Sequence, residues 1–381
     1  MGKTRDSIMT GIVRDAAEFA AARIAARPGL STERDFPADL WREMGSAGLL
    51  GTGVPRKYGG GGVGYPGISA AGGALARHGL CLGITLSWLM HQITARFFMC
   101  RFASPGQKQA VLPAMAQGTA TASIAISEPG AGGHPKHLRT SVEKGAGGYV
   151  LRGEKSFLTN GPIAGFFIVL AVSGQDGGRK RYSAFLVPRD CPGLSVTGPL
   201  DVGFLRPCPH GGIILDGCEV PPGSLLGNPD TAYEDMVLPF REVEDTSMMG
   251  PILGAQGARM DEIIASLRRM SGPVPDETAF RLGGVSSSLA ALDVLAREAA
   301  FLLENPGASD HLEPLVLAFR SLCGQVHREI GDMAALAGHH PSEAHRLLGL
   351  DLDQVVQFAG RVGRLKQNRL GARLVTGHSG V

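Results

Sequence analysis

The sequence has little net charge and few cysteines, and both shortages exclude classes of function. Its 37 Lys and Arg residues nearly balance its 35 Asp and Glu residues, which leaves a formal charge of +2. A chain this close to neutral offers no electrostatic basis for binding nucleic acid or an anionic membrane surface. Its 6 cysteines lie far apart and form no Cys-x-x-Cys pair, so neither a zinc site nor a dithiol redox motif is indicated. We expect no nucleic acid, membrane or metal among its partners.

Targeting signals are also scarce. The first residues contain no apolar signal-peptide core, and no uninterrupted apolar run reaches about 18 residues. Hydrophobic residues make up 44% and charged residues 19% of the 381 residues, which is typical of a folded globular protein. We expect free thiols and a cytoplasmic location, with room for two or three domains that share large cores.

Three stretches of different periodicity divide the chain and predict an α+β multidomain fold. Over residues 1–120, apolar residues recur every three or four positions and predict an N-terminal helical domain. Residues 121–229 contain short β runs separated by Gly-Gly and Pro-Gly turns, which predict a central antiparallel β-barrel or sandwich. Helical periodicity returns over residues 230–381, where Pro275 and Pro341 mark helix ends and a C-terminal four-helix bundle is expected.

Two segments of the central region carry the functional signal. An alternating strand containing Ile124 and Ile126 ends at Ser127 and runs into a turn, Glu-Pro-Gly-Ala-Gly-Gly, over residues 128–133. A second strand ends in Phe-Leu-Thr-Asn-Gly over residues 157–161. Strand ends with backbone donors and a hydroxyl can grip a flat heteroaromatic cofactor. The pair resembles the flavin-holding motifs of acyl-CoA dehydrogenases, Thr-Glu-Pro-x-Ala-Gly-Ser-Asp and Trp/Phe-Ile-Thr-Asn-Gly.

The resemblance covers most of the chain, including Val54-Pro55 through Gly60 and Leu186-Val187-Pro188. It implies an FAD-dependent oxidoreductase of acyl-CoA or fatty acid metabolism that dehydrogenates an acyl thioester, carried by CoA or by acyl carrier protein. That reaction needs a general base for the α-proton and flavin N5 to accept the β-hydride. The resemblance further implies electron-transfer flavoprotein as the acceptor and a homo-oligomer, dimer or tetramer, with the tetramer usual in the family.

The resemblance also assigns cofactor residues. It places Ile124, Ile126 and Ser127 at the flavin ring edge, Phe157 and Thr159 at the ring face and N5, and Gly132, Gly133 and Arg268 near the diphosphate. Two departures affect the diphosphate. Gly133 stands where the family has Ser, and the family's Arg-x-Gln-Phe-Gly becomes Arg-Arg-Met-Ser-Gly over residues 268–272. We expect the diphosphate to be held in an unusual way.

The general base is expected in a relocated position. Matching Asp351 to the family's Arg-Asp-Ala motif puts Ala359 where most members have the catalytic Glu. The isovaleryl and long-chain branches instead carry their Glu on the first bundle helix, and counting back from Gly254 on that helix gives Glu244. Asp245 follows where Arg is usual, and we expect this like charge to raise the pKa of Glu244.

Other interpretations stay open. A flavin monooxygenase on the same fold would take reduced flavin from a partner reductase and would suit the altered diphosphate motif, and a non-catalytic paralogue would serve as a subunit. His339, His340 and His345 lie close in sequence but lack a carboxylate to complete a metal site, which favours a solvated helix end. The basic residues between 361 and 373 are interpreted as a solvated helix face.

Overall fold

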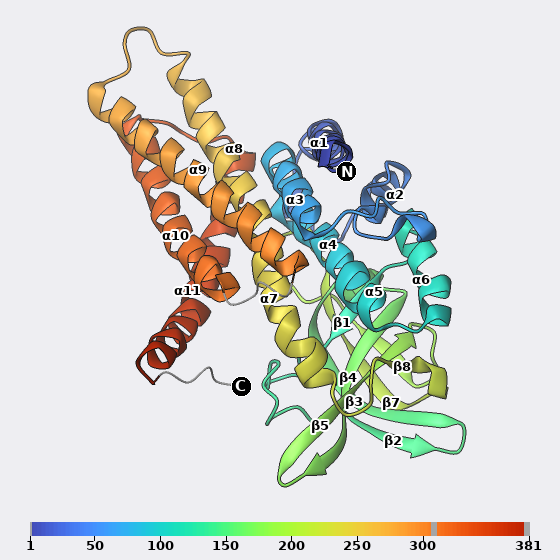
Figure 1. The fold of residues 1–381 in the computed structure, drawn as a ribbon. Helices are drawn as coiled ribbons and strands as arrows, with labels where there is room; N and C mark the ends of the chain where they lie inside the picture. The colour runs from blue at the N-terminus through green and yellow to red at the C-terminus, as the bar shows by residue number, and fades with distance from the viewer. Residues whose placement is uncertain (1, 306–310, 377–381) are drawn as a thin grey trace. The chain divides into compact units, whose positions relative to one another are not determined.

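The structure is a computed structural model that describes residues 2–305 and 311–376, without the side chains of residues 2–8 and 358–362. The chain divides into two compact units, whose elements are labelled in Figure 1. We call residues 32–64 and 83–244 the sheet unit, and residues 1–31, 65–82 and 245–381 the helical unit.

An eight-stranded sheet dominates the sheet unit. Its order is β6-β7-β3-β2-β4-β5-β8, and β1 pairs with β4. The strands are β1 (Ala122–Ala125), β2 (Ser141–Gly145), β3 (Gly148–Thr159), β4 (Phe166–Asp176), β5 (Arg179–Pro188), β6 (Leu194–Thr197), β7 (His210–Val220) and β8 (Leu225–Leu226). Most pairs are antiparallel, as predicted, but β1 and β2 run parallel to β4. Alternate side chains such as Leu151, Phe167 and Ile213 form the core.

The helices of the sheet unit are α2 (Ala38–Ser46), α4 (Leu82–Ile93), α5 (Cys100–Phe102), α6 (Pro105–Gln117) and the first part of α7 (Leu238–Ser247). One-turn 3₁₀ segments and two π-helical segments connect them: Leu49–Gly51, Arg56–Tyr58, Thr94–Met99, Gly161–Ile163, Pro222–Ser224 and Tyr233–Val237. The start of α6 confirms its sequence signal, because the Ser104 hydroxyl accepts from Gln107 N–H and the Gln107 side chain accepts from Ser104 N–H. These caps satisfy donors that a helix start leaves unpaired.

The helical unit contains α1 (Gly2–Phe19), continued by a π-helical turn (Ala20–Ile24), with α3 (Tyr65–Gly79), α8 (Met249–Leu267), α9 (Asp276–Glu304), α10 (Leu312–Leu336) and α11 (Glu343–Thr376). Helices α8, α9 and α10 lie side by side around one apolar core (Figure 1). Helices α3 and α8 approach closely at two glycines: a Cβ added to Gly250 would lie 2.0 Å from Ser69 O, and one added to Gly254 would lie 2.0 Å from Gly73 O.

The order of helices, sheet and helices confirms the predicted fold class. The predicted domain limits at residues 120 and 229 stay predictions, since the helical unit combines α1 and α3 with the C-terminal helices. Within the described ranges one helix, α9, is long and apolar enough to cross a membrane by length and composition alone, and 17% of its most apolar window is buried.

Candidate cofactor site and general base

The two segments that resemble flavin-holding motifs, called the flavin-like segments below, are residues 124–133 and residues 155–160. The first lies directly against the second. Ile124 sits in β1 opposite Ile168 of β4, and Ile126 and Ser127 follow the end of that strand. Ser127 O accepts a hydrogen bond of 3.0 Å from Ser156 N–H, one residue before the second motif. Two of the predicted segments therefore meet side by side.

The second segment contains a strained residue. The pairing of β3 with β7 shifts register between Lys155 and Leu158. Within this bulge Phe157 has φ of +58° and is 61% exposed, although it is a large apolar side chain. A non-glycine residue at positive φ costs free energy and is common at functional sites. The neighbouring Ser156 hydroxyl is buried and has no hydrogen-bond partner among the residues that the structure describes.

Thr159 closes the second segment. It pairs with His210 of β7, and its carbonyl accepts from the Ser123 hydroxyl at 2.7 Å. The next residue, Asn160, is fully buried at φ of +63° and donates from Nδ2 to Ser87 O at 2.8 Å. The strand end is thus fixed both to β1 and to α4.

A buried ion pair joins the two segments. Lys155 is fully buried, and its Nζ donates to Glu128 Oε1 at 2.9 Å and to Ile126 O at 3.0 Å. Glu128 also accepts from the N–H groups of Arg139 (2.7 Å) and Thr140 (2.9 Å). Burial lowers the pKa of Lys155 to about 8, against the opposing attraction of Glu128. Neither residue was predicted from the sequence; the available signal was a carboxylate shortly after β1 and a lysine within β3.

The turn after β1 is held by its own backbone. Glu128 N–H donates to Gly132 O and Gly132 N–H donates to Glu128 O, both at 3.0 Å. Gly132 has φ of +53°, which favours glycine there. The turn therefore begins at the residue whose side chain binds Lys155, so the ion pair also supports the turn.

Three groups around Gly133 come from two parts of the sheet unit, the end of β1 and helix α7. A Cβ added to Gly133 would lie 3.6 Å from Ile126 Cγ2, 3.9 Å from Ser127 Oγ and 4.0 Å from Arg241 Nη2. The sequence predicted the first two as neighbours of the turn. Arg241 was missed, because only the packing of α7 brings it there.

Helix α7 carries Glu244 and is anchored by its apolar side. Phe240 and Val243 are buried, and the Phe240 ring centroid lies 5.3 Å from that of Phe98. Glu244 is half-buried. Arg241 precedes it by three residues, a spacing that places two side chains on the same side of a helix. Glu244 therefore lies one turn along α7 from the residue that contacts Gly133.

Two cations offset the charge of Asp245, the residue that was expected to raise the pKa of Glu244. Asp245 accepts from Arg320 Nη2 at 2.5 Å and from Lys366 Nζ at 2.7 Å, and all three side chains are mostly buried. The prediction that Asp245 raises the pKa of Glu244 considered only the sequence neighbour. The two cations come from α10 and α11 and offset its negative charge. Lys366 is therefore not part of a solvated basic face.

Two predicted positions lie in the helical unit. Arg268 follows the last residue of α8 and is exposed. By resemblance it would serve the cofactor of a neighbouring subunit, and the structure contains a single chain. Position 359 lies within α11, a continuous helix of 34 residues. The side chain of Ala359 is outside the described residues.

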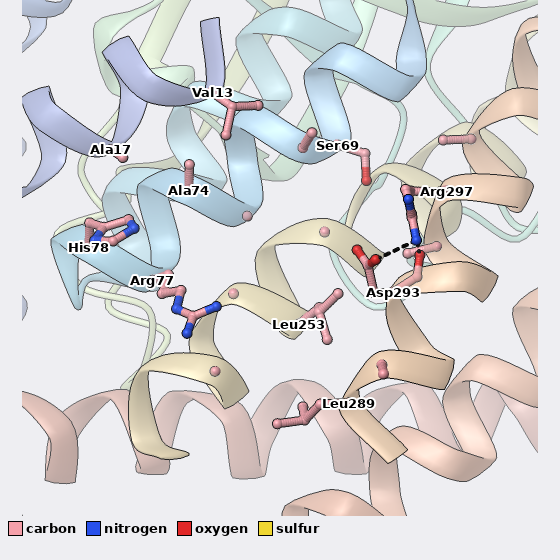
Figure 2. Close-up of a pocket in the computed structure, with 18 of the residues that line it drawn as sticks. Val13, Ala17, Ser69, Ala74, Arg77, His78, Leu253, Leu289, Asp293 and Arg297 are labelled. Carbon is pink, nitrogen blue, oxygen red and sulfur yellow. Dashed lines mark hydrogen bonds and ion pairs between the residues drawn. The ribbon is translucent and has the colours of Figure 1, made fainter. Parts of the chain in front are cut away.

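A separate pocket of about 930 Å³ lies within the helical unit (Figure 2). It is lined by α1, α3, α8 and α9, largely through small residues such as Ala17, Ala74 and Gly254. An ion pair between Asp293 and Arg297 lies on one wall at 2.7 Å. No predicted site residue lines this pocket, so it is distinct from the flavin-like segments.

Of the three histidines expected at a solvated helix end, His340 is exposed, but His339 and His345 are paired with a carboxylate, contrary to expectation. His339 Nε2 lies 3.1 Å and His345 Nδ1 lies 3.0 Å from the Glu262 carboxylate, and these side chains are 7% and 15% exposed. Glu262 also accepts from Ser342 N–H at 2.8 Å. The part of the chain that the structure describes holds no group of three His, Cys, Asp or Glu residues arranged for a metal ion.

Comparison with known proteins identifies the family. The model of the acyl-CoA dehydrogenase N-terminal domain matches residues 10–119, and that of the acyl-CoA dehydrogenase middle domain matches residues 123–218. Together these matches cover more than half of the chain. The protein belongs to the acyl-CoA dehydrogenase family of oxidoreductases.

Similar proteins fall in the same family. The chain is 35% identical over 296 residues to an L-prolyl-(peptidyl-carrier protein) dehydrogenase of Pseudomonas fluorescens, covering 75% of each protein. It is 34% identical to an acyl-CoA dehydrogenase of Bacillus subtilis, covering 58% of this chain and 57% of that one. Its fold matches a glutaryl-CoA dehydrogenase of Mycobacterium smegmatis, solved in complex with FADH2, with a TM-score of 0.81 at 20% identity over 98% of this chain and 95% of that chain.

Proposed function

We propose that this protein is an FAD-dependent dehydrogenase of an acyl thioester, with Glu244 as its general base. One observation carries the proposal: residues 124–133 and 155–160, the segments expected to hold the flavin, contact each other in the sheet unit, and α7 brings Arg241 to Gly133 one turn before Glu244. Family membership supports the same reaction class.

The residues present fit a flavin. Phe157 exposes an aromatic ring at a strained position, and the buried Ser156 hydroxyl beside it lacks a partner. A flat heteroaromatic ring with acceptor atoms suits an apolar surface next to unpaired donors. Ile126, Phe157, Thr159 and the backbone of Ser127 would hold the ring, and Gly132 and Gly133 its diphosphate. When bound, FAD supplies the hydride acceptor.

The protein's own residues have defined tasks in this reaction. Glu244 would take the proton from the carbon next to the thioester carbonyl. A half-buried carboxylate is suited to this work, since partial desolvation favours its protonated form. Hydrogen-bond donors around the thioester carbonyl would stabilise the negative charge that develops on its oxygen.

The thioester carrier is proposed from the comparisons. The chain shares 75% coverage and 35% identity with an enzyme named for a prolyl group on a peptidyl carrier protein. This likeness favours a prolyl or similar acyl group on a carrier protein as the second candidate, beside acyl-CoA. We also propose electron-transfer flavoprotein as the acceptor, a cytoplasmic location and a homo-oligomer. The exposed Phe280, Val294 and Phe301 of α9 are apolar residues that a second copy would cover.

Anaerobic bleaching of the bound flavin tests the function. The purified protein should bind FAD and lose its yellow colour with an acyl-CoA or a prolyl carrier-protein thioester. Glu244→Gln should keep FAD but slow bleaching by roughly 10²–10⁴-fold, because the proton acceptor is lost. Glu242→Gln, an exposed neighbour on α7, is the matched control and should bleach at the normal rate.

The same experiment separates the alternatives. Normal bleaching in Glu244→Gln would remove Glu244 from its assigned role. A wild-type protein that binds only reduced flavin and then consumes oxygen would indicate a monooxygenase. A protein that binds no flavin in either redox state would indicate a non-catalytic paralogue.

A further inference from the structure

Three hydrogen-bond donors lie near one another at Gly133. Among the described residues, Gly133 N–H and the Ser127 hydroxyl donate to no group. Arg241 reaches the same point from α7, where its Nη2 donates to Gly133 O and to Tyr233 OH, each at 3.4 Å. Both distances are long for an N–H···O hydrogen bond, so these contacts hold the guanidinium weakly.

The guanidinium of Arg241 brings positive charge to this point, and among the described residues no ion pair holds it. The nearest carboxylate in the turn, Glu128, is bound to Lys155 and to two backbone N–H groups. Arg241 is exposed, so a ligand can reach it. A guanidinium beside a free backbone N–H and a hydroxyl is a donor set that matches the oxygens of a phosphate group.

The position of Arg241 is set by packing, independently of any ligand. The buried Phe240 and Val243 fix the rotation of α7 in the sheet unit, and this rotation directs Arg241 towards the turn. Tyr233, whose ring lies 5.4 Å from that of Tyr182, supplies the second contact. The packing of α7 places Arg241 at the glycine turn, where it makes only long hydrogen bonds. Its guanidinium is therefore available to bind a ligand.

We propose that Arg241, together with Gly133 N–H and the Ser127 hydroxyl, binds a phosphate group of the cofactor or the substrate carrier. The inference rests on the proposed function and adds to it the residue that takes the place of the hydroxyl absent at position 133. Two sources share this chemistry: the diphosphate of FAD, and the phosphate esters of CoA or of a phosphopantetheine arm. Arg241 and Glu244 lie one turn apart on α7, so one helix carries both the proposed phosphate site and the proposed base.

Binding measurements with Arg241→Gln test the proposal. FAD and riboflavin share the ring, but only FAD carries the diphosphate. If the diphosphate is the ligand, the variant should bind FAD about ten- to a hundredfold more weakly and riboflavin normally. Arg139→Gln is the matched control: its exposed side chain lies in the same loop region, and it should bind both as the wild type does.

A second arm addresses the substrate carrier. If the carrier phosphate is the ligand, Arg241→Gln should keep normal FAD affinity and raise KM about tenfold or more for the CoA thioester. KM should not change for the pantetheine thioester, which lacks phosphate. Equal weakening of FAD and riboflavin, or no change in any of these values, would overturn the proposal.

The failure of the proposed function is visible separately, because the wild-type protein would then bind no FAD. In that case inorganic pyrophosphate is the probe. It should raise the unfolding temperature of the wild-type protein and not that of Arg241→Gln, whereas an equal response of the two proteins would overturn the phosphate site.

Discussion

One ion pair of the sheet unit and one of the helical unit differ sharply in burial. In the sheet unit, Lys155 and Glu128 are 0% and 7% exposed, and they lie 27 residues apart in sequence. In the helical unit, Arg77 and Asp261 form a two-fold hydrogen-bonded pair with side chains 47% and 51% exposed, 184 residues apart. A buried pair is costly to break on one side, whereas an exposed pair contributes little. The Lys155–Glu128 pair therefore fixes the two segments that it joins, whereas the Arg77–Asp261 pair contributes little to the stability of the helical unit.

The strongest test of this contrast removes one side of the buried pair. Lys155→Met should destabilise the sheet unit by about 3–5 kcal/mol, because Glu128 then remains buried without its cation. Both flavin-like segments should loosen, so FAD affinity should fall as well. Chemical denaturation and FAD titration measure the two effects. The matched control is Arg152→Met on the same strand, whose partner Asp216 is 91% exposed at 3.5 Å; it should change neither value by much.

The double variant Lys155→Met/Glu128→Gln sharpens the result. It should recover part of the lost stability, because no unpaired charge stays buried. The amide oxygen introduced at position 128 can still accept hydrogen bonds from the N–H groups of Arg139 and Thr140.

The pH dependence of stability has a definite sign. The pKa of Lys155 is lowered to about 8 from a usual 10.5, so the folded state releases this proton first. Stability attributable to Lys155 should rise with pH between these values. A fall over that range would contradict the lowered pKa.

The second test concerns packing in the helical unit. Gly254→Ala should cost about 1–3 kcal/mol, because the added methyl group would lie 2.0 Å from Gly73 O and the α3–α8 contact must open. Gly331→Ala on α10 is the control: a Cβ there meets nothing within 4 Å. It should instead stabilise the protein by about 0.5–1 kcal/mol through helix propensity. Thermal unfolding of the two variants should shift in opposite directions; equal shifts would mean that the close approach is not needed.

How much the sequence predicted follows the same contrast. The two segments, residues 124–133 and 155–160, could be recognised from sequence because strand ends and turns form locally, as at Ser127 and Gly133. Arg241 could not, because its contact with Gly133 depends on the rotation of α7 set by Phe240 and Val243. The ion pairs of Asp245 could not be predicted for the same reason, because Arg320 and Lys366 lie 75 and 121 residues away in the sequence. Turns and strand ends can be predicted from neighbouring residues, whereas the charges that surround a helix depend on which helices pack beside it.

The smallest expected effect tests the charged cluster at Glu262. Burial raises the pKa of Glu262, but hydrogen bonds from Ser342 and His339 and the charge of His345 outweigh it, so the pKa lies below its usual 4.5. A carboxylate with a lowered pKa contributes stability above its unfolded pKa and loses it as the pH falls through the folded value. Glu262→Gln should therefore cost about 1 kcal/mol at pH 7, where the ionised carboxylate accepts these hydrogen bonds.

The difference between the two proteins should shrink below a pH of about 4.5, as the wild-type carboxylate takes up its proton. Glu298→Gln, an exposed position on α9, is the control and should match the wild type at both pH values. Urea denaturation at pH 7 and pH 4 provides the measurement. If the cost of Glu262→Gln equalled that of Lys155→Met, the helical unit would depend on buried charge as strongly as the sheet unit does, and the distinction between the two units would fail.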